Sequence, residues 1–388
     1  MIKKMFLHYD YSLLVTTLML IGFGLIMIYS AGSVWASMVM RPPRPADYYF
    51  LKQGMWFIAS LPFGVLGMII PYTKYHKLVK PLLICSLFLL VLLFFAGSVR
   101  NNAASWLSFG GFNLQPAELV KITLIFYLAS VFSNKQNKIG DFKTAVLPPL
   151  IVIALFFFLV AMQPDLGTAM ILIMLSSIMV LCSGLRMKHL VLLCGGAVTF
   201  VFAYMMMATS HVQSGRFTAA YDPFSVADTT GRQLINSYIA IASGGLFGKG
   251  LGRSIEKTGF LPEPQTDFII AIIGEELGLI GILFVILCIA YLVFRGFVTA
   301  IRCKDAFGSL LAIGISSLLA IQTFVNLGAA TGLLPVTGVT LPFVSYGGSS
   351  LITLVFSMGV LLNISSSVNM RRQSRSQEGK RENVETFN

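Results

Sequence analysis

The first candidate for chemistry in this chain is an aspartate between a glycine-rich polar segment and a long apolar run. Asp267 lies near the end of residues 244–278, GGLFGKGLGRSIEKTGFLPEPQTDFIIAIIGEELG, in a chain that is 56% hydrophobic and 11% charged. A carboxylate at such a boundary can serve as a general base, although the helix dipole also favours an acid in a first turn. On an ideal helix Ala271, Gly274 and Gly278 share its face, which allows close helix packing or a slot for a polyprenyl chain.

Two further acidic positions are candidates. Glu118 and Lys121 are three residues apart in an expected helix and therefore share a face. Ionisable residues inside a span usually face a protein interior or a wet cavity, so a structural ion pair and a substrate-binding pair both remain open. Asp165 follows Pro164 and precedes an apolar run, so it is either a helix N-cap or part of a site.

Cations in the outer segments form a second set of candidates. Arg216, Lys249 and Lys257 occur in a mixed-charge, glycine-rich loop. Such a loop can be simply solvated, or it can bind a pyrophosphate leaving group. Glu275 and Glu276 lie about 12 Å further along the same expected helix than Asp267, where we expect a structural network. No ligand spacing in the sequence indicates a metal site.

These residues must be positioned by membrane helices, because the mean hydropathy is +0.81 and a span needs about 20 apolar residues. We predict an all-α polytopic membrane protein with about ten transmembrane helices. The apolar runs are residues 12–32, 53–71, 77–97, 117–133, 146–162, 166–184, 189–209, 268–294, 306–328 and 345–367.

The lysines and arginines predict that both chain ends are cytoplasmic, because they concentrate in one set of short connections. The segments 98–116, 210–266 and 329–344 then lie outside, and 210–266 is a large loop between helices 7 and 8. A site on that face has no access to nucleotides, so we expect a lipid-linked substrate. The net charge of +12 is scattered among helix ends, which argues against a nucleic-acid partner.

The chain is expected to form one membrane domain, residues 1–370. The last segment, residues 371–388, reads RRQSRSQEGKRENVETFN. Its high charge and lack of apolar residues predict a disordered, basic cytoplasmic tail.

Taken together, the motifs resemble the SEDS family, whose members act in shape, elongation, division and sporulation of bacteria. Residues 340–350 and the opening apolar segment are more similar to the division type, FtsW, than to the elongation type, RodA. The matching pieces are Trp106-Leu107, LQPAELVKI (114–122), QPDLGTA (163–169), SGGLFGKGLGRS (243–254), LPEPQTDF (261–268), GEELG (274–278) and TLPFVSYGGSS (340–350).

The resemblance implies an inverting peptidoglycan glycosyltransferase that polymerises lipid II into β-1,4 glycan strands. It implies septal cell-wall synthesis at the bacterial cytoplasmic membrane, with a class B penicillin-binding transpeptidase and divisome membrane proteins as partners. Asp267 matches the essential aspartate of the family, and Glu118, Lys121 and Asp165 match other motif positions. The remaining expected substrate contacts are Trp106, Arg216, Lys249, Lys257 and Ser345.

The cations are expected to balance the leaving pyrophosphate, with or without a divalent cation, Mg²⁺ or Mn²⁺. The chain departs modestly from the family pattern: Gln265 replaces a frequent His, Ala117 a frequent Ser, and Ser105 a frequent Arg. Three other hypotheses stay open, namely a lipid II flippase, a scaffold for division proteins, and the elongation or sporulation type of the same enzyme.

Overall fold

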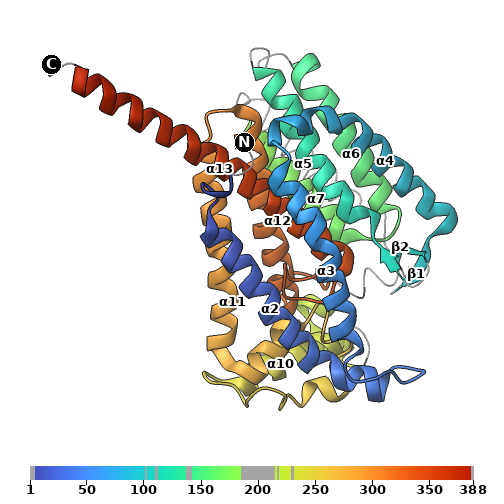
Figure 1. Cartoon of the computed structure of the whole chain (residues 1–388). Helices are drawn as coiled ribbons and strands as arrows, with labels where there is room; N and C mark the ends of the chain where they lie inside the picture. The colour runs from blue at the N-terminus through green and yellow to red at the C-terminus, as the bar shows by residue number, and fades with distance from the viewer. Residues whose placement is uncertain are drawn as a thin grey trace.

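The protein is a bundle of long helices with a small sheet and a set of loops at one end (Figure 1). The structure, a computed structural model, describes residues 5–100, 103–109, 112–136, 142–184, 215, 218–228 and 231–385. Nine of the ten predicted apolar spans fall on described helices, and the tenth, residues 189–209, lies outside the described residues.

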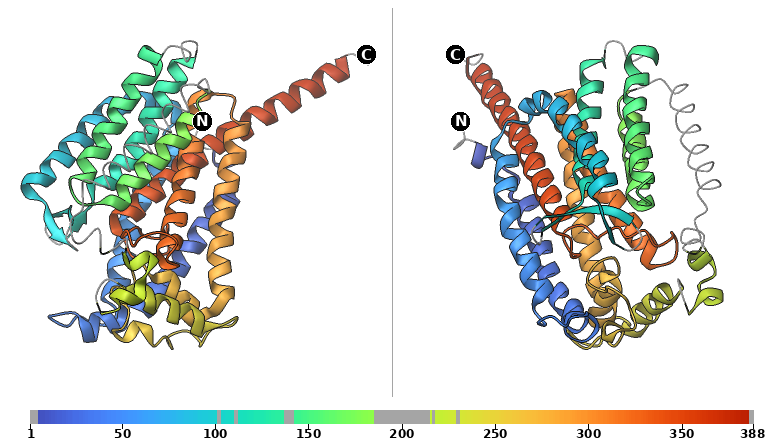
Figure 2. Two further views of the ribbon diagram at one scale, coloured as in Figure 1. Left: turned by 180° about the vertical axis from the view of Figure 1, so that it is seen from behind. Right: turned by 90° about the vertical axis from the view of Figure 1, so that its right-hand side faces the viewer.

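Within the described ranges, six helices are long and apolar enough to cross a membrane. They are α2 (Tyr11–Val34), α4 (Tyr75–Ala96), α5 (Pro116–Asn134), α11 (Ile269–Arg302), α12 (Ala306–Ala330) and α13 (Gly348–Glu385). The other main helices are α3 (Tyr48–Ile69), α6 (Leu147–Ala161), α7 (Leu166–Leu181) and the short α10 (Arg232–Gly244). Both chain ends lie at one end of the bundle, and α10 lies at the opposite end (Figure 2).

Small residues bring α3 and α13 into close contact. A Cβ atom placed on Gly64 would lie 2.7 Å from Val355 Cγ1, and one on Gly67 would lie 2.7 Å from the Phe356 carbonyl oxygen. Helices in lipid associate through such close packing, because lipid tails are as apolar as the side chains they would replace. Gln53 of α3 also forms hydrogen bonds with the loop that enters α13.

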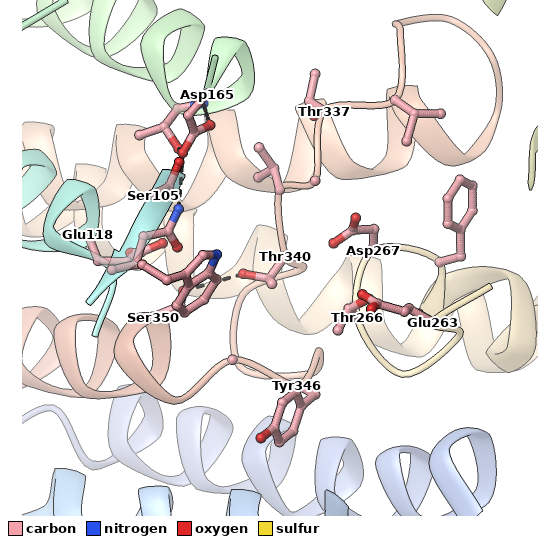
Figure 3. A pocket seen from close by; sticks show the side chains of 18 of the residues that line it. Ser105, Glu118, Asp165, Glu263, Thr266, Asp267, Thr337, Thr340, Tyr346 and Ser350 are labelled. Atoms are coloured by element: carbon pink, nitrogen blue, oxygen red, sulfur yellow. Dashed lines mark hydrogen bonds between the residues drawn. The ribbon is translucent and has the colours of Figure 1, made fainter. Parts of the chain in front are cut away.

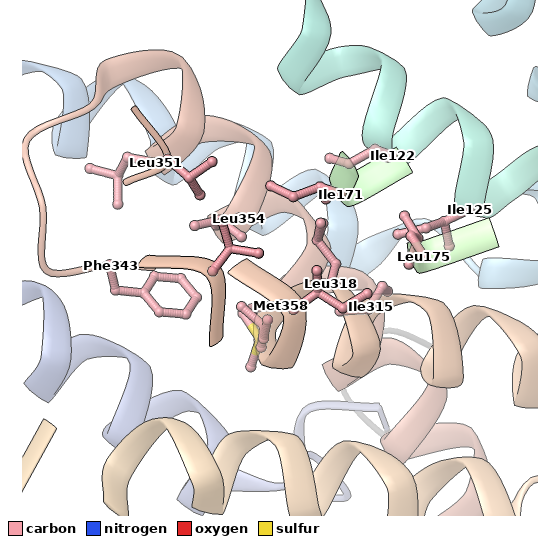
Figure 4. Packing of buried hydrophobic residues seen from close by; sticks show 14 of the residues in the cluster. Ile122, Ile125, Ile171, Leu175, Ile315, Leu318, Phe343, Leu351, Leu354 and Met358 are labelled. Atoms are coloured by element: carbon pink, nitrogen blue, oxygen red, sulfur yellow. The ribbon is translucent and has the colours of Figure 1, made fainter. Parts of the chain in front are cut away.

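Part of the core of the bundle is built from apolar side chains of α5, α7, α12 and α13 (Figure 4). Branched residues from α5, α7 and α12 meet Leu354 and Met358 of α13. Each of these helices contributes one or two residues to the lining of the site described below. The labelled members of this cluster are Ile122, Ile125, Ile171, Leu175, Ile315, Leu318, Phe343, Leu351, Leu354 and Met358.

A three-stranded antiparallel sheet precedes α5, where the sequence predicted only a polar outer segment. It consists of β1 (Ser98–Arg100), β2 (Ala103–Phe109) and β3 (Phe112–Leu114), in the order β1-β2-β3. Leu107 pairs with Leu114, and β3 runs through Gln115 into the first turn of α5, where proline is well tolerated. The sheet thereby places Trp106 beside the start of α5.

The helix that follows Asp267 is interrupted. Gly278, within α11, has φ 66° and ψ −161°, which is not helical. The backbone groups around the break bond instead to a glycine-rich loop, residues 245–250. The amides of Lys249 and Gly250 donate to the carbonyls of Glu275 and Glu276, both at 2.9 Å. In return the amides of residues 279 and 280 donate to the carbonyls of residues 245 and 246, at 2.9 and 3.3 Å.

This exchange satisfies backbone groups that a broken helix would leave open, a requirement that is strict in a membrane. Glycine is needed on the loop side, because a Cβ on Gly248 would lie 2.2 Å from the Glu276 carbonyl oxygen. The first part of α11, which follows Asp267, is therefore held by the loop as well as by its own helix.

The last helix continues beyond residue 370. α13 extends to Glu385 (Figure 1), so residues 371–385 are helical where the composition predicted disorder. Arg, Gln, Glu and Lys have high helix propensity, and adding residues to an existing helix avoids the cost of nucleation. The domain boundary at residue 370 and the cytoplasmic side of the tail stay predictions.

Candidate functional site

A cavity of about 680 Å³ brings together five of the residues singled out in the sequence. They come from the sheet, α5, the turn before α7 and the turn before α11, which are far apart along the chain. In Figure 3, Glu118 and Asp165 lie on one side of the cavity and Asp267 on the other. The five residues are Trp106, Glu118, Lys121, Asp165 and Asp267.

Asp267 lies in a turn, two residues before α11 begins. Its backbone carbonyl accepts a hydrogen bond of 2.8 Å from Asn326 Nδ2 of α12, and the same nitrogen donates to the Val339 carbonyl at 2.8 Å. A Cβ placed on Gly338 would lie 3.7 Å from Asp267 Oδ2. The N-cap residue of α11 is Phe268 rather than Asp267, and the partly exposed carboxylate faces the cavity (Figure 3).

Glu118 and Lys121 form a buried ion pair in the first turns of α5. Lys121 Nζ lies 2.9 Å from Glu118 Oε1, and Thr353 Oγ1 of α13 donates to Glu118 Oε2 at 3.3 Å. Both residues also line the cavity. A structural ion pair and a substrate-binding pair, the two interpretations left open by the sequence, are therefore compatible. The two side chains bond each other, and they also face the space where a ligand would bind.

Asp165 is the N-cap of α7, as its position after a proline turn predicts. Its carboxylate accepts from the Thr168 amide and the Thr168 hydroxyl, both at 3.0 Å, and from Gln115 Nε2 at 3.1 Å. Desolvation raises the pKa of Asp165, while the bonds from Thr168 and the charge of Lys121 act in the opposite direction. Asp165 thus links the start of α7 to the residue that precedes α5.

Two of the predicted substrate-binding cations lie elsewhere. Lys249 Nζ pairs with Glu275 Oε1 at 2.8 Å, and Lys257 Nζ pairs with Glu276 Oε1 at 2.7 Å. Neither lysine lines the cavity, because the loop that carries them folds back over the break in α11. The expected structural network around the two glutamates is confirmed, and Ser30 of α2 joins it through its hydroxyl, which donates to Glu276.

Two other predicted contacts are not part of the described site. Ser345 is buried, and its hydroxyl accepts a hydrogen bond of 2.9 Å from the Leu341 amide, which stabilises the turn before α13. Arg216 lies outside the described residues.

The cavity contains charged residues that the sequence did not indicate as site residues. Lys52 of α3, Arg232 at the start of α10 and Glu263 before α11 all line it. Lys52 and Arg232 carry the positive charge that Lys249 and Lys257 were expected to supply. The sequence offered no local signal for this, because both occur without a neighbouring motif.

The order of the motifs and the cavity they build match one protein family. A family model described as "Cell cycle protein", for FtsW, RodA and SpoVE, matches residues 11–370. This chain belongs to the FtsW/RodA/SpoVE family. Because the described residues alone contain six helices long and apolar enough to cross a membrane, it is a multi-pass membrane protein.

Relatives in the FtsW/RodA/SpoVE family match over almost the whole chain. The "Probable peptidoglycan glycosyltransferase FtsW" of Bacillus subtilis (strain 168) is 46% identical, over 97% of this chain and 96% of the relative. "Stage V sporulation protein E" of the same organism is 39% identical, over 92% of this chain and 95% of the relative.

Solved structures of the same fold are also similar. A chain from a structure described as "Structural coordination of polymerization and crosslinking by a peptidoglycan synthase complex" has a TM-score of 0.75 and 25% identity, covering 93% of this chain and 98% of that one. The crystal structure of the rod shape determining protein RodA of Thermus thermophilus has a TM-score of 0.67 and 26% identity, covering 92% and 96%.

Proposed function

We propose that this protein is a peptidoglycan glycosyltransferase that polymerises lipid II in septal cell-wall synthesis. The observation that carries the proposal is the cavity, which unites Asp267, the Glu118–Lys121 pair and Asp165 in a chain of this family. The 46% identity to a relative named FtsW, against 39% to a sporulation relative, supports the division type.

The proposal includes the predicted topology of about ten helices, with both ends in the cytoplasm and the large loop outside. The chain ends share one end of the bundle (Figure 2), as an even number of spans requires. In this orientation the turn with Asp267 faces the outer side, where a lipid-linked sugar is accessible.

In the proposed mechanism Asp267 is the general base. Its carboxylate accepts the proton of an acceptor hydroxyl, whose oxygen attacks the anomeric carbon of the lipid-linked sugar. The bond from that carbon to the pyrophosphate oxygen breaks with inversion, and its electron pair leaves with the pyrophosphate. Inversion in a single displacement requires the base and the leaving pyrophosphate to lie on opposite faces of the donor sugar.

Positive charge for the leaving pyrophosphate comes, in this proposal, from cations that line the cavity. Lys121, Lys52 and Arg232 all do so, and charge-assisted bonds to phosphate oxygens are strong. Because Lys121 also pairs with Glu118, its ammonium is held in one place before a ligand arrives. Such preorganised charge is what stabilises a developing anion.

A divalent cation, Mg²⁺ or Mn²⁺, is part of the proposal. The described residues hold no group of three or more His, Cys, Asp or Glu side chains suited to a metal ion. Mg²⁺ is commonly bound by one or two carboxylates together with substrate phosphates. Glu263 lines the cavity and is the carboxylate that would fit such a role, in which the ion would neutralise phosphate charge and Asp267 would remain the base.

We further propose a class B penicillin-binding transpeptidase and divisome membrane proteins as partners, at the division septum. The solved chain of similar fold that belongs to a peptidoglycan synthase complex supports a synthase partner. The test is purified protein in proteoliposomes with lipid II, with and without its transpeptidase. Glycan strands support the proposal, whereas transbilayer movement of lipid II without polymer would support a flippase.

A further inference from the structure

One buried side chain in the cavity has hydrogen-bonding groups that the described protein does not satisfy. Gln322 of α12 is 1% exposed and lines the cavity. Within the described part of the chain, neither its Oε1 nor its Nε2 has a hydrogen-bond partner. The hydroxyl oxygen of Thr337, also in the cavity lining, is buried and without a partner in the same residues. Buried polar groups are nearly always bonded, so such exceptions point to a role.

Gln322 and Thr337 are each near, along the chain, to a residue that lies against Asp267. Asn326, which bonds the backbone of Asp267, is four residues after Gln322 and therefore on the same face of α12. Thr337 precedes Gly338, the residue whose Cβ would approach the Asp267 carboxylate. Figure 3 shows Thr337 and Asp267 on neighbouring parts of the cavity wall.

The backbone that carries these groups is held firmly. A Cβ placed on Gly167 of α7 would lie 2.6 Å from the Thr337 carbonyl oxygen, so this loop lies directly against α7. Asn326 bonds the Val339 carbonyl from the other side. A site built from such supported residues is preorganised for its ligand.

The chemistry of the unsatisfied atoms defines the ligand. A glutamine amide offers an N–H donor and a carbonyl acceptor side by side, and a threonine hydroxyl offers both. A secondary amide complements this set: its N–H and C=O point in opposite directions, so its carbonyl can accept from Gln322 Nε2 while its N–H donates to the Thr337 hydroxyl oxygen. Peptidoglycan sugars carry such a group as the 2-acetamido substituent, a few bonds from the ring hydroxyls.

We propose that Gln322, together with Thr337, is the subsite that recognises the acetamido group of the sugar bound next to Asp267. The inference rests on the proposed glycosyltransferase function and deepens it by naming the feature of the sugar that is recognised. Amides of the stem peptide share this chemistry, and the experiment separates them from the acetamido group.

The experiment compares the wild-type protein with Gln322→Met and Thr337→Val on three lipid-linked substrates. These are lipid II, lipid II whose sugars are N-deacetylated, and the lipid-linked disaccharide without peptide. The control variant is Ser317→Ala, which removes another buried group of α12 that has no partner among the described residues and is not part of the cavity lining.

We expect the wild-type protein to prefer acetylated substrate by about 100-fold or more in kcat/KM, as sites built around buried hydrogen bonds do. Gln322→Met should lower kcat/KM for both acetylated substrates by about 10- to 100-fold and leave the deacetylated substrate nearly unchanged. Thr337→Val should act in the same direction with a smaller factor. If Gln322→Met keeps the wild-type preference for acetylated over deacetylated substrate, the proposal is overturned. If Gln322→Met lowers kcat/KM for lipid II but not for the lipid-linked disaccharide without peptide, the subsite binds an amide of the stem peptide instead.

Thermal unfolding separates a ligand site from a structural role. Replacing an unpartnered buried amide with an apolar side chain of similar length should leave the Tm unchanged or raise it. A clear drop in Tm would show that Gln322 stabilises the fold and would overturn the proposal.

If no variant or wild-type protein forms polymer, the glycosyltransferase proposal fails. The subsite is then tested by binding of the lipid-linked disaccharide, acetylated and deacetylated, to wild-type protein and Gln322→Met. Preference for the acetylated lipid in the wild type alone supports the subsite, and equal preference in both contradicts it.

Discussion

The loop lysine Lys257 distinguishes a substrate-binding cation from a structural one. The Lys257 side chain is 5% exposed and Glu276 is fully buried, with 2.7 Å between Nζ and Oε1. Lys257 Nζ also donates to Ser30 Oγ at 3.0 Å. In Lys257→Met, the Glu276 carboxylate keeps the Ser30 hydroxyl and the Ser254 amide, at 2.7 and 3.4 Å, but loses its counter-charge.

The expected destabilisation follows from this geometry. Removing one partner of a buried pair commonly costs about 3–5 kcal/mol, because the other charge remains buried without compensation. Replacing both partners with uncharged groups is often near neutral. We therefore expect Lys257→Met to be less stable by about 3–5 kcal/mol, and Lys257→Met/Glu276→Gln to recover most of that loss.

The assay is reversible unfolding in detergent micelles, with kcat/KM measured on the folded fraction of each variant. Lys249→Met is the matched control, since Lys249 pairs with Glu275 but its side chain is 31% exposed, and a smaller loss is expected. Wild-type stability of Lys257→Met together with a raised KM for lipid II would refute the structural role of Lys257. If the double variant Lys257→Met/Glu276→Gln were no more stable than Lys257→Met, that result would equally contradict a structural ion pair.

Three further predictions concern the same region and the cavity. Gly278→Ala should destabilise the protein by at least about 1–3 kcal/mol of backbone strain, because its φ is positive and the new Cβ would lie 2.5 Å from the Gly248 amide nitrogen. Chemical denaturation checks this, and a wild-type midpoint would be inconsistent with the observed break. Burial, and secondly the nearby Glu275, raises the pKa of Glu256, so the folded state binds its proton more tightly than the unfolded state. The stability advantage of Glu256→Gln over wild type should therefore be absent below the unfolded pKa of about 4.5 and grow as pH rises above it; a constant difference from pH 4 to 8 would contradict this origin. Chelation of divalent cations should slow polymerisation, with recovery on adding Mg²⁺ or Mn²⁺, and full activity in excess chelator would exclude the proposed ion.

Much of the helical framework could be predicted from the sequence, because an apolar run of bilayer length has few alternatives. The break in α11 could not, since Gly278 stands in a sequence that is otherwise typical of a helix. Its conformation depends on the loop at residues 245–250, which supplies backbone partners from far along the chain. A glycine within a helical pattern is only a weak signal of such a break.

Glu118, Asp165 and Asp267 were predictable from their motifs and from the cost of placing charge in a span, whereas Glu263 was not. Of the cations, only Lys121 was predicted, through its pairing with Glu118. Lys52 and Arg232 line the cavity only because α3 and α10 pack where they do, which local sequence does not specify. Lys257 was expected to bind substrate because a loop cation near glycines suits a phosphate, but its ion pair with Glu276 depends on tertiary folding of the loop.

The β-sheet before α5 was also missed, since its strands are short and its alternation is weak. Gln322 carried no signal in the sequence either. A glutamine in an apolar helix is usually bonded within the protein, and only the arrangement of the cavity distinguishes it.

The measurement that tests the central claim most directly is glycan polymerisation by Asp267→Asn. This variant keeps the size of the side chain and the backbone carbonyl that Asn326 binds, but it removes the carboxylate that accepts the proton. Purified with its transpeptidase and given lipid II, the wild-type protein should form glycan strands. Asp267→Asn should retain the wild-type Tm and lose activity by about 10²- to 10⁴-fold. Full-length strands made at the wild-type rate by a folded Asp267→Asn protein would contradict the assignment of Asp267 as the base.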